Sequence, residues 1–556
     1  MIVRHLIVEL LEQALGEAQE MGLLPPGTAP EVTVEHPQSP EHGDFATSLP
    51  LRLARSLRMN PLDIAQRLVP LIRLPETMER VWVEPPGFIN FSLKASWLVS
   101  RVEGIIEEGE TYGNVDLGKG ERVQVEFVSV NPTGPIHVGH ARGAVLGDAL
   151  AEVLSAAGYQ VTREYYVNDT GNQMEAFYSS LYARYQQAFG LPAEMPQGGY
   201  MGDYMMDLAQ AMAAEEGDRF LSTAPQEATQ ELGRMGLEQM LQQIRGDLER
   251  LRVRFDVWFR EQALHHGGQL EKAMGLLRQG NHMVEREGAT WFVSTALGED
   301  KDNVLVRSSG VPTYFAADVA YHYNKFVERG FSRVIDIWGA DHQGHVSRMK
   351  AAVGALGIDP HRLTIIISQL VTLKREGQLL RVSKRTGDLI TLADLLEEVG
   401  PDPCRYFFLA RSPESQMEFD LDLAKKESAE NPVYYIQYAH ARIASILRLA
   451  QENSIDYHDG DVSLLTDPAE MDLIRKMDML PELVESMAIN LEPHHLPHYA
   501  QDLATAFHWF YQQCRVVSST PGDEALTRAR LKLVKAAAIV LGRCLHLMGM
   551  EAPEQM

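Results

Sequence analysis

The chain has 556 residues, of which 45% are apolar and 23% charged; this is an ordinary globular composition, and the length is too great for one hydrophobic core. It has no apolar run near the ~20 residues of a membrane span, and its three cysteines form no CxxC pair, which argues against a membrane protein, a disulfide framework and a cysteine-rich metal site. The net charge of −25 argues against nucleic-acid binding over the whole surface, so any such binding must use local basic stretches such as 374–385 and 528–543.

Residues 1–112 have a pattern of their own. The chain opens with MIVRHLIVELLEQALGEAQEMG, in which Glu and Gln interrupt the apolar run, so we expect an amphipathic helix rather than a signal peptide. Apolar and polar residues alternate on either side of a Pro-Pro-Gly bend at 85–87, which predicts paired strands. We expect an α+β domain here.

The interval 118–426 predicts a doubly wound nucleotide-binding domain with a parallel sheet. The apolar strand VQVEFVSV leads into the loop NPTGPIHVGHARG and then into a helical run. Further strand-like runs, RVIDIWGA and LTIIISQLV, stand between helical segments. Residues 172–290 are rich in Met, Gln and Glu with helical spacing, so we expect a helical insertion between two halves of the nucleotide fold.

The last interval, 427–556, has helical spacing nearly throughout and few strand signals. Asn431-Pro432 marks its entry, because Asn suits a helix cap and Pro the first helical position. We expect a separate, all-α domain built as a helical bundle.

The loop–helix junction of the nucleotide fold carries the sequence His137-Val138-Gly139-His140. The start of a helix offers free backbone N–H groups and a positive dipole end, which suit phosphate. Two imidazole rings there can donate hydrogen bonds to phosphate oxygens, and Gly139 leaves room for a flat adenine ring. Taken alone, the pattern also fits a pair of polar helix caps.

A second basic segment, VSKRTG, occupies residues 382–387. Lys384 and Arg385 in a short loop can hold a triphosphate and stabilise charge that develops on the reacting phosphorus, where loss of one such donor costs ~10²–10³ in rate. Taken alone, the segment also fits a solvated basic turn.

Together, HVGH and RVSKR resemble the HIGH and KMSKR signatures of class I aminoacyl-tRNA synthetases, with Val in place of Ile and Arg-Val in place of Lys-Met. The resemblance is specific to bacterial arginyl-tRNA synthetases and extends, in order, over VEFVSVNPTGPIHVGHARGAVLGDALA, REYYVNDTGNQM, DKDNVLVRSSGVPTYFAADVAYH, GADHQGHVSRMKAA, YYIQYAHARIASI, FHWFYQQCRV and LMGMEAPEQM. It implies a multidomain α/β protein with a Rossmann-type catalytic domain, an added N-terminal domain that contacts the tRNA elbow, and an anticodon-binding C-terminal domain. It also implies ATP with Mg²⁺, L-arginine and arginine tRNA as substrates.

The resemblance further implies a set of site residues. The ATP-binding positions are Pro132, Gly134, His137, Gly139, His140, Ser383 and Lys384, and the catalytic groups are His137, His140, Lys384 and Arg385. The arginine-binding positions are Glu126, Asn131, Glu287, Tyr314, Asp318, His342 and Gln343. The tRNA-binding positions are Tyr434, Tyr438, Arg442 and Arg515.

Physical chemistry agrees with the arginine site. A guanidinium group is a planar cation that needs a carboxylate partner, and the i, i+4 spacing of Tyr314 and Asp318 places both on one helix face. Glu126 and Asn131 are expected at the α-amino and carboxyl ends of arginine. Each residue also fits a plainer role: Asp318 a surface acid, Tyr314 a core tyrosine, and Asn131 a turn residue.

Two further points stay open. The segment VNDTGNQ, with Asn168, Asp169 and Gln173, either lies near the active site or forms a helix cap. The aromatic residues of the C-terminal domain either stack on bases or form bundle core.

Competing functions are a synthetase for another amino acid and a non-catalytic or regulatory paralogue that binds RNA or a partner protein. A cysteinyl enzyme would want zinc ligands, and a glutamyl or glutaminyl enzyme a cationic or amide-reading pocket in place of Asp318. The intact HxGH and SKR argue against the paralogue. We expect a cytoplasmic monomer without a membrane partner or structural metal, and the resemblance implies that bound tRNA precedes activation.

Overall fold

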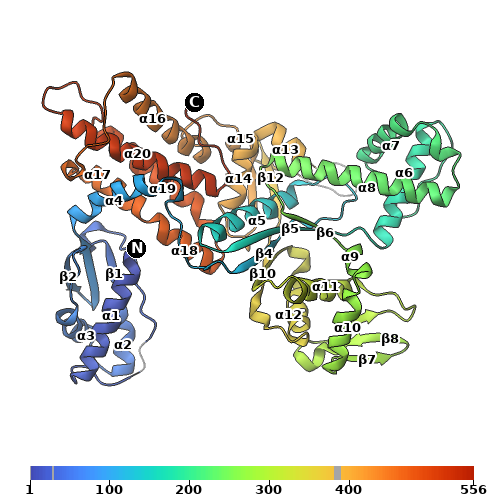
Figure 1. The fold of residues 1–556 in the computed structure, drawn as a ribbon, viewed down its shortest axis with the longest axis horizontal. Helices are drawn as coiled ribbons and strands as arrows, with labels where there is room; N and C mark the ends of the chain where they lie inside the picture. Colours follow the sequence, from blue (N-terminus) through green and yellow to red (C-terminus); the bar gives the residue numbers. More distant parts are fainter. Residues whose placement is uncertain (1, 28–29, 381–389) are drawn as a thin grey trace.

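The computed structural model describes residues 2–27, 30–380 and 390–556. In Figure 1 the N-terminal domain and the C-terminal helices lie toward one end of the molecule, and a helical arm lies at the other. A parallel sheet lies between them. No described helix is both long and apolar enough to cross a membrane.

The N-terminal domain is an antiparallel sheet of order β1-β3-β2 with helices packed against it. Its elements are α1 (Val3–Glu20), β1 (Phe45–Thr47), α2 (Leu49–Leu57), α3 (Pro61–Leu68), β2 (Met78–Glu84) and β3 (Phe88–Leu93). The expected strand pair is confirmed, since Val83 lies opposite Ile89. In α1 the buried Ile7, Leu11 and Ala18 lie on one face, which confirms the amphipathic helix.

Helix α4 (Ala95–Glu108) departs from the expected grouping of residues 1–112. It packs against α17 (Pro468–Asp478) and α20 (Glu524–Leu547) of the C-terminal bundle. Arg101 Nε donates to Asp478 Oδ1 over 2.6 Å, and Lys532 Nζ donates to Glu103 Oε1 over 2.6 Å. Because α4 buries its apolar face against these helices, the folded N-terminal unit ends with β3.

The catalytic region contains a five-stranded parallel sheet of order β11-β10-β4-β5-β6. Its elements are β4 (Arg122–Glu126), α5 (Val138–Ala156), β5 (Gln160–Val167), β6 (Val257–Arg260), β10 (Arg333–Gly339) and β11 (Leu363–Ser368). The chain moves outward from β4 to β6 and then returns to β10 on the other side of β4. The doubly wound sheet is therefore confirmed, and its topological switch point lies between β4 and β10, where ligands of such sheets bind.

The helical arm consists of α6 (Asn172–Ala188), α7 (Asp203–Glu216) and α8 (Pro225–Arg250), as Figure 1 shows. The structure divides the expected helical insertion over 172–290, because β6 returns to the sheet, with Trp258 opposite Tyr165. A strand of four residues carries too little periodicity to be recognised inside such an interval.

A second unit follows β6 and has a hydrophobic core of its own. It contains α9 (Gln262–His266), α10 (Gln269–Gln279), β7 (Met283–Arg286), β8 (Ala289–Phe292), β9 (Asn303–Val306), α11 (Tyr314–Tyr323) and α12 (Val346–Ala355). The strands form an antiparallel sheet of order β7-β8-β9. A π-helical turn, Asn324–Glu328, continues directly from α11.

The chain then forms a small sheet of order β13-β12-β14 and enters the C-terminal bundle. The elements before the bundle are β12 (Val371–Arg375), β13 (Gln378–Leu379), α13 (Leu392–Val399), α14 (Pro401–Leu409), β14 (Met417–Asp420) and α15 (Leu421–Ala424). The bundle contains α16 (Pro432–Glu452), α17, α18 (Leu480–Asn490), α19 (His495–Gln513) and α20. Its expected entry is confirmed, since Asn431 Oδ1 caps α16 by accepting from Val433 N over 3.1 Å.

Candidate active site

The HxGH segment lies where β4 gives way to α5, at the carboxyl edge of the sheet. His137 is the N-cap of α5, and its Nδ1 accepts from Gly139 N over 3.1 Å. The centroids of the His137 and His140 rings are 3.6 Å apart. A Cβ atom on Gly139 would lie 2.9 Å from the His137 ring, so glycine leaves room for the ring to fold over the start of the helix. Both imidazoles are thereby held together at a positive helix end.

Ser383, Lys384 and Arg385 lie outside the described residues, but the chain that follows them runs beside the HxGH segment. Val138 N donates to the carbonyl oxygen of Ile390 over 3.3 Å, and Leu392 N donates to that of Ile136 over 2.8 Å. Residues 390–392 thus pair with residues 136–138.

The loop between β4 and α5 is supported by the helical arm. The Tyr204 hydroxyl donates to the carbonyl oxygen of Thr133 over 2.7 Å. A Cβ atom on Gly134 would lie 3.3 Å from the Tyr204 ring. The close approach explains the glycine at 134, and Pro132 lies in the same supported loop.

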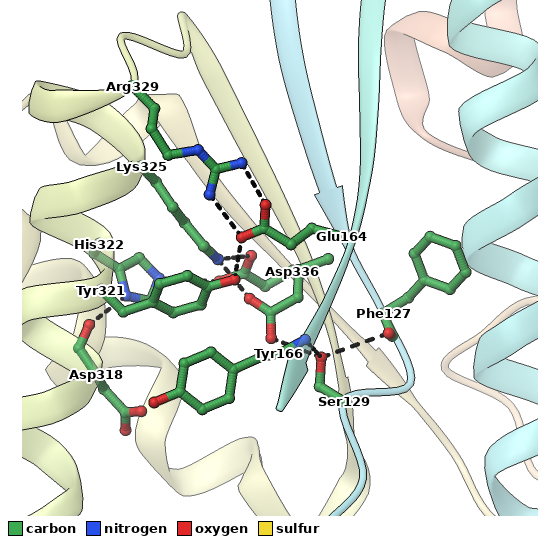
Figure 2. A network of polar contacts seen from close by, with 11 residues as sticks. Phe127, Ser129, Glu164, Tyr166, Asp318, Tyr321, His322, Lys325, Arg329 and Asp336 are labelled. Carbon is green, nitrogen blue, oxygen red and sulfur yellow. Dashed lines mark hydrogen bonds and ion pairs between the residues drawn. The ribbon is translucent and has the colours of Figure 1, made fainter. Parts of the chain in front are cut away.

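Acidic side chains gather at the carboxyl ends of the strands. Glu126 ends β4 and is buried, and Asp318 lies on α11 with its carboxylate near the Tyr166 ring (Figure 2). Burial raises the pKa of Asp318 to about 7, with the negative charges of Glu126 and Glu261 adding to the shift and His322 opposing it. Several acids therefore lie close together in this region, which suits a cationic ligand.

Glu261 is a member of this cluster that the sequence did not single out. It follows β6 directly, is 4% exposed, and its negative charge helps to raise the pKa of the Tyr166 phenol, for which burial is the larger cause. In the amide orientation that satisfies its neighbours, Asn168 donates to Glu261 Oε2 over 3.1 Å. The available signal was an acid at the end of a strand, but that strand was itself missed.

Glu287 lies elsewhere. It is an exposed residue in the turn between β7 and β8, with a positive φ of 53° beside Gly288. The register pairs Arg286 with Ala289, so Glu287 lies at the tip of a two-residue hairpin. The structure does not bring it to the acidic cluster, in which Glu261 lies near Asp318.

The other expected arginine-binding residues lie around the same edge of the sheet. Asn131 Nδ2 donates to Gln173 Oε1 over 2.5 Å. Tyr314 begins α11, and its hydroxyl lies close to Gly171, where a Cβ atom would be 3.3 Å away. His342 and Gln343 are exposed in a 3-10 turn that follows β10.

The VNDTGNQ segment is part of this edge rather than a plain helix cap. Asp169 is buried, and its Oδ1 accepts from Gln262 N over 3.1 Å, whereas Gly171 takes the N-cap position of α6. The segment therefore joins the ends of β5 and β6 and holds Glu261 in place.

A separate groove lies on the C-terminal bundle. The Arg442 guanidinium lies 4.6 Å from the Tyr438 ring and 4.8 Å from the Tyr511 ring. These residues line a depression of about 490 Å³ together with Met556. Tyr434 stacks on Tyr438 with ring centroids 6.0 Å apart. The groove offers exposed aromatic and guanidinium planes.

Arg515 does not line this groove. Its Nε donates to the carbonyl oxygen of Val517 over 3.3 Å, beyond the C-terminal end of α19. The four expected tRNA-binding residues therefore do not form one cluster.

Three family models match the chain. The model described as "Arginyl tRNA synthetase N terminal domain" matches residues 5–93, "tRNA synthetases class I (R), catalytic domain" matches 101–404, and "DALR anticodon binding domain" matches 436–556. The first of these ends at β3 and the second begins within α4, in agreement with the packing of α4 away from the N-terminal unit.

Relatives that match over nearly the whole chain are named arginine–tRNA ligases. An arginine–tRNA ligase of Dehalococcoides mccartyi is 56% identical over 554 residues, which is 100% of this chain and 99% of the relative. An arginine–tRNA ligase of Carboxydothermus hydrogenoformans is 50% identical over 94% of each chain. The arginyl-tRNA synthetase structure of Thermus thermophilus shares the fold, with a TM-score of 0.78 over 100% of both chains at 24% identity. The chain therefore belongs to the arginine–tRNA ligases, a family of class I aminoacyl-tRNA synthetases.

Proposed function

We propose that this chain activates L-arginine with ATP and transfers it to the 3′-terminal adenosine of arginine tRNA. The observation that carries the proposal is the convergence of Asp318, Glu261 and Glu126 at the carboxyl edge of the sheet, beside the helix that begins at His137. A guanidinium group and an α-ammonium group would add positive charge to this cluster, in which the acids outnumber Lys325, the lysine that pairs with Glu126. Family membership supports the same reaction.

In the first step the arginine carboxylate attacks the α-phosphorus of ATP, supplied with Mg²⁺ as a substrate, and pyrophosphate leaves. His137 and His140 donate hydrogen bonds to the phosphates, and Lys384, assisted by Arg385, stabilises the charge of the transition state. No protein nucleophile is needed, so catalysis consists of positioning and electrostatic stabilisation. In the second step the tRNA adenosine attacks the activated carbonyl and AMP leaves.

Arginine recognition uses both ends of the amino acid. Asp318 and Glu261 receive the guanidinium group, with Tyr314 at its edge, while Glu126 and Asn131 receive the α-amino and carboxyl groups. His342 and Gln343, which follow β10, complete the rim of the arginine site. A pair of carboxylates suits arginine better than lysine, because a planar fork can bind both at once.

The tRNA is held by the two outer domains. Tyr438 and Arg442 present planes on which unpaired anticodon bases can stack. Tyr434 stacks on Tyr438, and Arg515 lies outside the groove. The N-terminal domain contacts the tRNA elbow. We further propose that the protein acts as a monomer in the cytoplasm, in accord with its three buried, free cysteines.

The decisive experiment is ATP–pyrophosphate exchange with each standard amino acid, with arginine tRNA present. Arginine alone is expected to support exchange, and exchange with a different amino acid instead would overturn the assignment. The Glu261→Gln and Glu287→Gln pair tests the site: the first should raise the arginine KM by about tenfold or more, and the second should change it by less than about twofold. If Glu287→Gln raised the arginine KM more than Glu261→Gln, the guanidinium group would be recognised at the hairpin tip instead.

A further inference from the structure

Three acids lie side by side across the middle of the parallel sheet. The register pairs Asp336 of β10 with Glu126 of β4, and Glu126 with Glu164 of β5. Paired residues of neighbouring strands point to the same face, about 4.8 Å apart. All three are buried, and Asp336 and Glu164 are fully so. Three like charges removed from water at this spacing are strongly destabilising unless cations lie among them.

The compensating groups all come from the end of α11 and the turns that follow it (Figure 2). Lys325 Nζ donates to Glu126 Oε2 over 2.5 Å and to Asp336 Oδ1 over 2.8 Å. Arg329 Nη1 donates to Glu164 Oε1 over 2.8 Å. The Lys325 side chain is fully buried, so its ammonium group bridges two strands out of contact with solvent.

A π-helical turn, Asn324–Glu328, delivers this lysine to the sheet. Such turns are rare and are frequently found at functional sites. Here Lys325 and Arg329 between them donate hydrogen bonds to the three acids of the sheet. Tyr321, one turn earlier, donates its hydroxyl to Glu164.

The same network reaches the residues proposed to bind arginine. His322 Nε2 lies 2.9 Å from Asp336 Oδ2, and its Nδ1 lies 2.8 Å from the carbonyl oxygen of Asp318. At the other end, Glu126 Oε1 accepts from Ser129 Oγ over 2.9 Å. A continuous path of buried and partly buried contacts therefore joins the strand end that carries Glu126 to the helix backbone that carries Asp318.

We propose that Lys325 is a positioning residue for amino-acid recognition, whose buried ammonium group fixes Glu126 relative to Asp318 and thereby sets the separation between the two carboxylates that hold the substrate. The inference rests on the proposed function for the identity of that substrate. Lys325 does not touch arginine; it acts through Glu126 and, by way of Asp336 and His322, through α11. A fixed separation selects a side chain of one length.

The test uses Lys325→Met, which keeps the aliphatic stem, and Lys325→Arg, which keeps the charge. Lys272→Met is the matched control, because this exposed lysine pairs with Glu328 of the same π turn over 2.7 Å. Lys325→Met is expected to raise the arginine KM by about tenfold or more while the ATP KM stays within about twofold. Lys325→Arg should recover part of this loss, and Lys272→Met should resemble the wild type.

A second readout separates positioning from mere destabilisation. Homoarginine is one methylene longer than arginine, so the ratio of kcat/KM for arginine over homoarginine measures selection by length. Lys325→Met should lower this ratio by about fivefold or more, and a variant that only lowers the melting temperature should not change it. An unchanged ratio, or arginine and ATP KM values that rise together, would overturn the proposal.

The outcomes for function and for positioning are distinguishable. If the wild-type chain does not activate arginine, the proposed function fails and this inference fails with it. If the wild type activates arginine and Lys325→Met does so with the same KM and the same selectivity, only the inference on Lys325 fails.

Discussion

The buried guanidinium of Arg142 donates a hydrogen bond of 2.7 Å to the carbonyl oxygen of Ser415, joining α5 to the segment that precedes β14. Further donations reach the carbonyl oxygens of Ser412 over 2.7 Å and Gln369 over 3.1 Å. Burial lowers the pKa of Arg142 to about 10. One side chain of α5 thus holds in place the segments that precede β12 and β14.

Replacing Arg142 by methionine should therefore leave buried carbonyl groups without donors. We expect the melting temperature to fall by about 5 °C or more, because each unsatisfied buried group costs about 1–3 kcal/mol. Differential scanning calorimetry measures this. Arg234→Met is the control, since the exposed Arg234, as far as the described residues show, donates only to the Gln230 carbonyl oxygen of its own helix. Equal melting temperatures for the two variants would contradict the structural role of Arg142.

Arginine binding should depend on pH through Asp318. Burial, with Glu126 and Glu261 nearby, raises its pKa to about 7, so below pH 7 the carboxyl is mostly neutral and cannot pair with a guanidinium. The arginine KM should fall by up to about tenfold between pH 6 and pH 8, and Asp318→Asn should raise it and flatten the profile. Pyrophosphate exchange at saturating ATP and tRNA provides the measurement. A wild-type KM that is flat or rises with pH would refute this.

The same shift predicts a cost to stability in the ligand-free protein. Folding raises the pKa of Asp318 from near 4 to about 7. The free energy of unfolding therefore falls as the pH rises through this range, because the native state then holds a proton that the unfolded state has lost. At pH 8, Asp318→Asn should therefore melt higher than the wild type without arginine. With saturating arginine the difference should shrink or reverse, because the ligand stabilises only the form that binds it. Melting curves with and without arginine test this, and a lower melting temperature for the free variant would count against it.

Lys384 should act in the chemical step. We expect Lys384→Ala to reduce adenylate formation by about 100-fold or more, because a cation aimed at developing charge is lost, with arginine affinity largely unchanged. Single-turnover formation of arginyl-adenylate measures the rate, and calorimetric titration with arginine measures binding. An unchanged rate would remove this lysine from the mechanism.

Arg442 should matter for tRNA and not for the amino acid. Its guanidinium lies against the Tyr438 and Tyr511 rings in the groove of the C-terminal bundle. Arg442→Ala should raise the tRNA KM by about tenfold, since a stacking plane is worth about 1–3 kcal/mol per base, and should leave the arginine KM within about twofold. Arg515→Ala, outside the groove, should have a smaller effect. Aminoacylation at varied tRNA concentration decides between them.

Local patterns in the sequence were sufficient for much of the fold and for part of the candidate site. The strand, loop and helix from Arg122 to Ala156, the paired strands around residue 86 and the helical C-terminal bundle follow from periodicity and turn residues, which act over a few positions. The roles expected of His137, His140, Tyr314 and Asp318 came from the resemblance to arginyl-tRNA synthetases and stay predictions.

Tertiary structure decided the rest, because it depends on contacts between residues far apart in the chain. Nothing local indicates that four residues at 257–260 return to the sheet and carry Glu261 to the acidic cluster, or that Glu287 ends at a hairpin tip. Nor does the sequence show that strand register sets Asp336, Glu126 and Glu164 side by side, with Lys325 as the buried bridge. Spacing along the chain specifies which face a side chain occupies, whereas strand order and register determine which charges become neighbours, and these are fixed only when the whole sheet assembles.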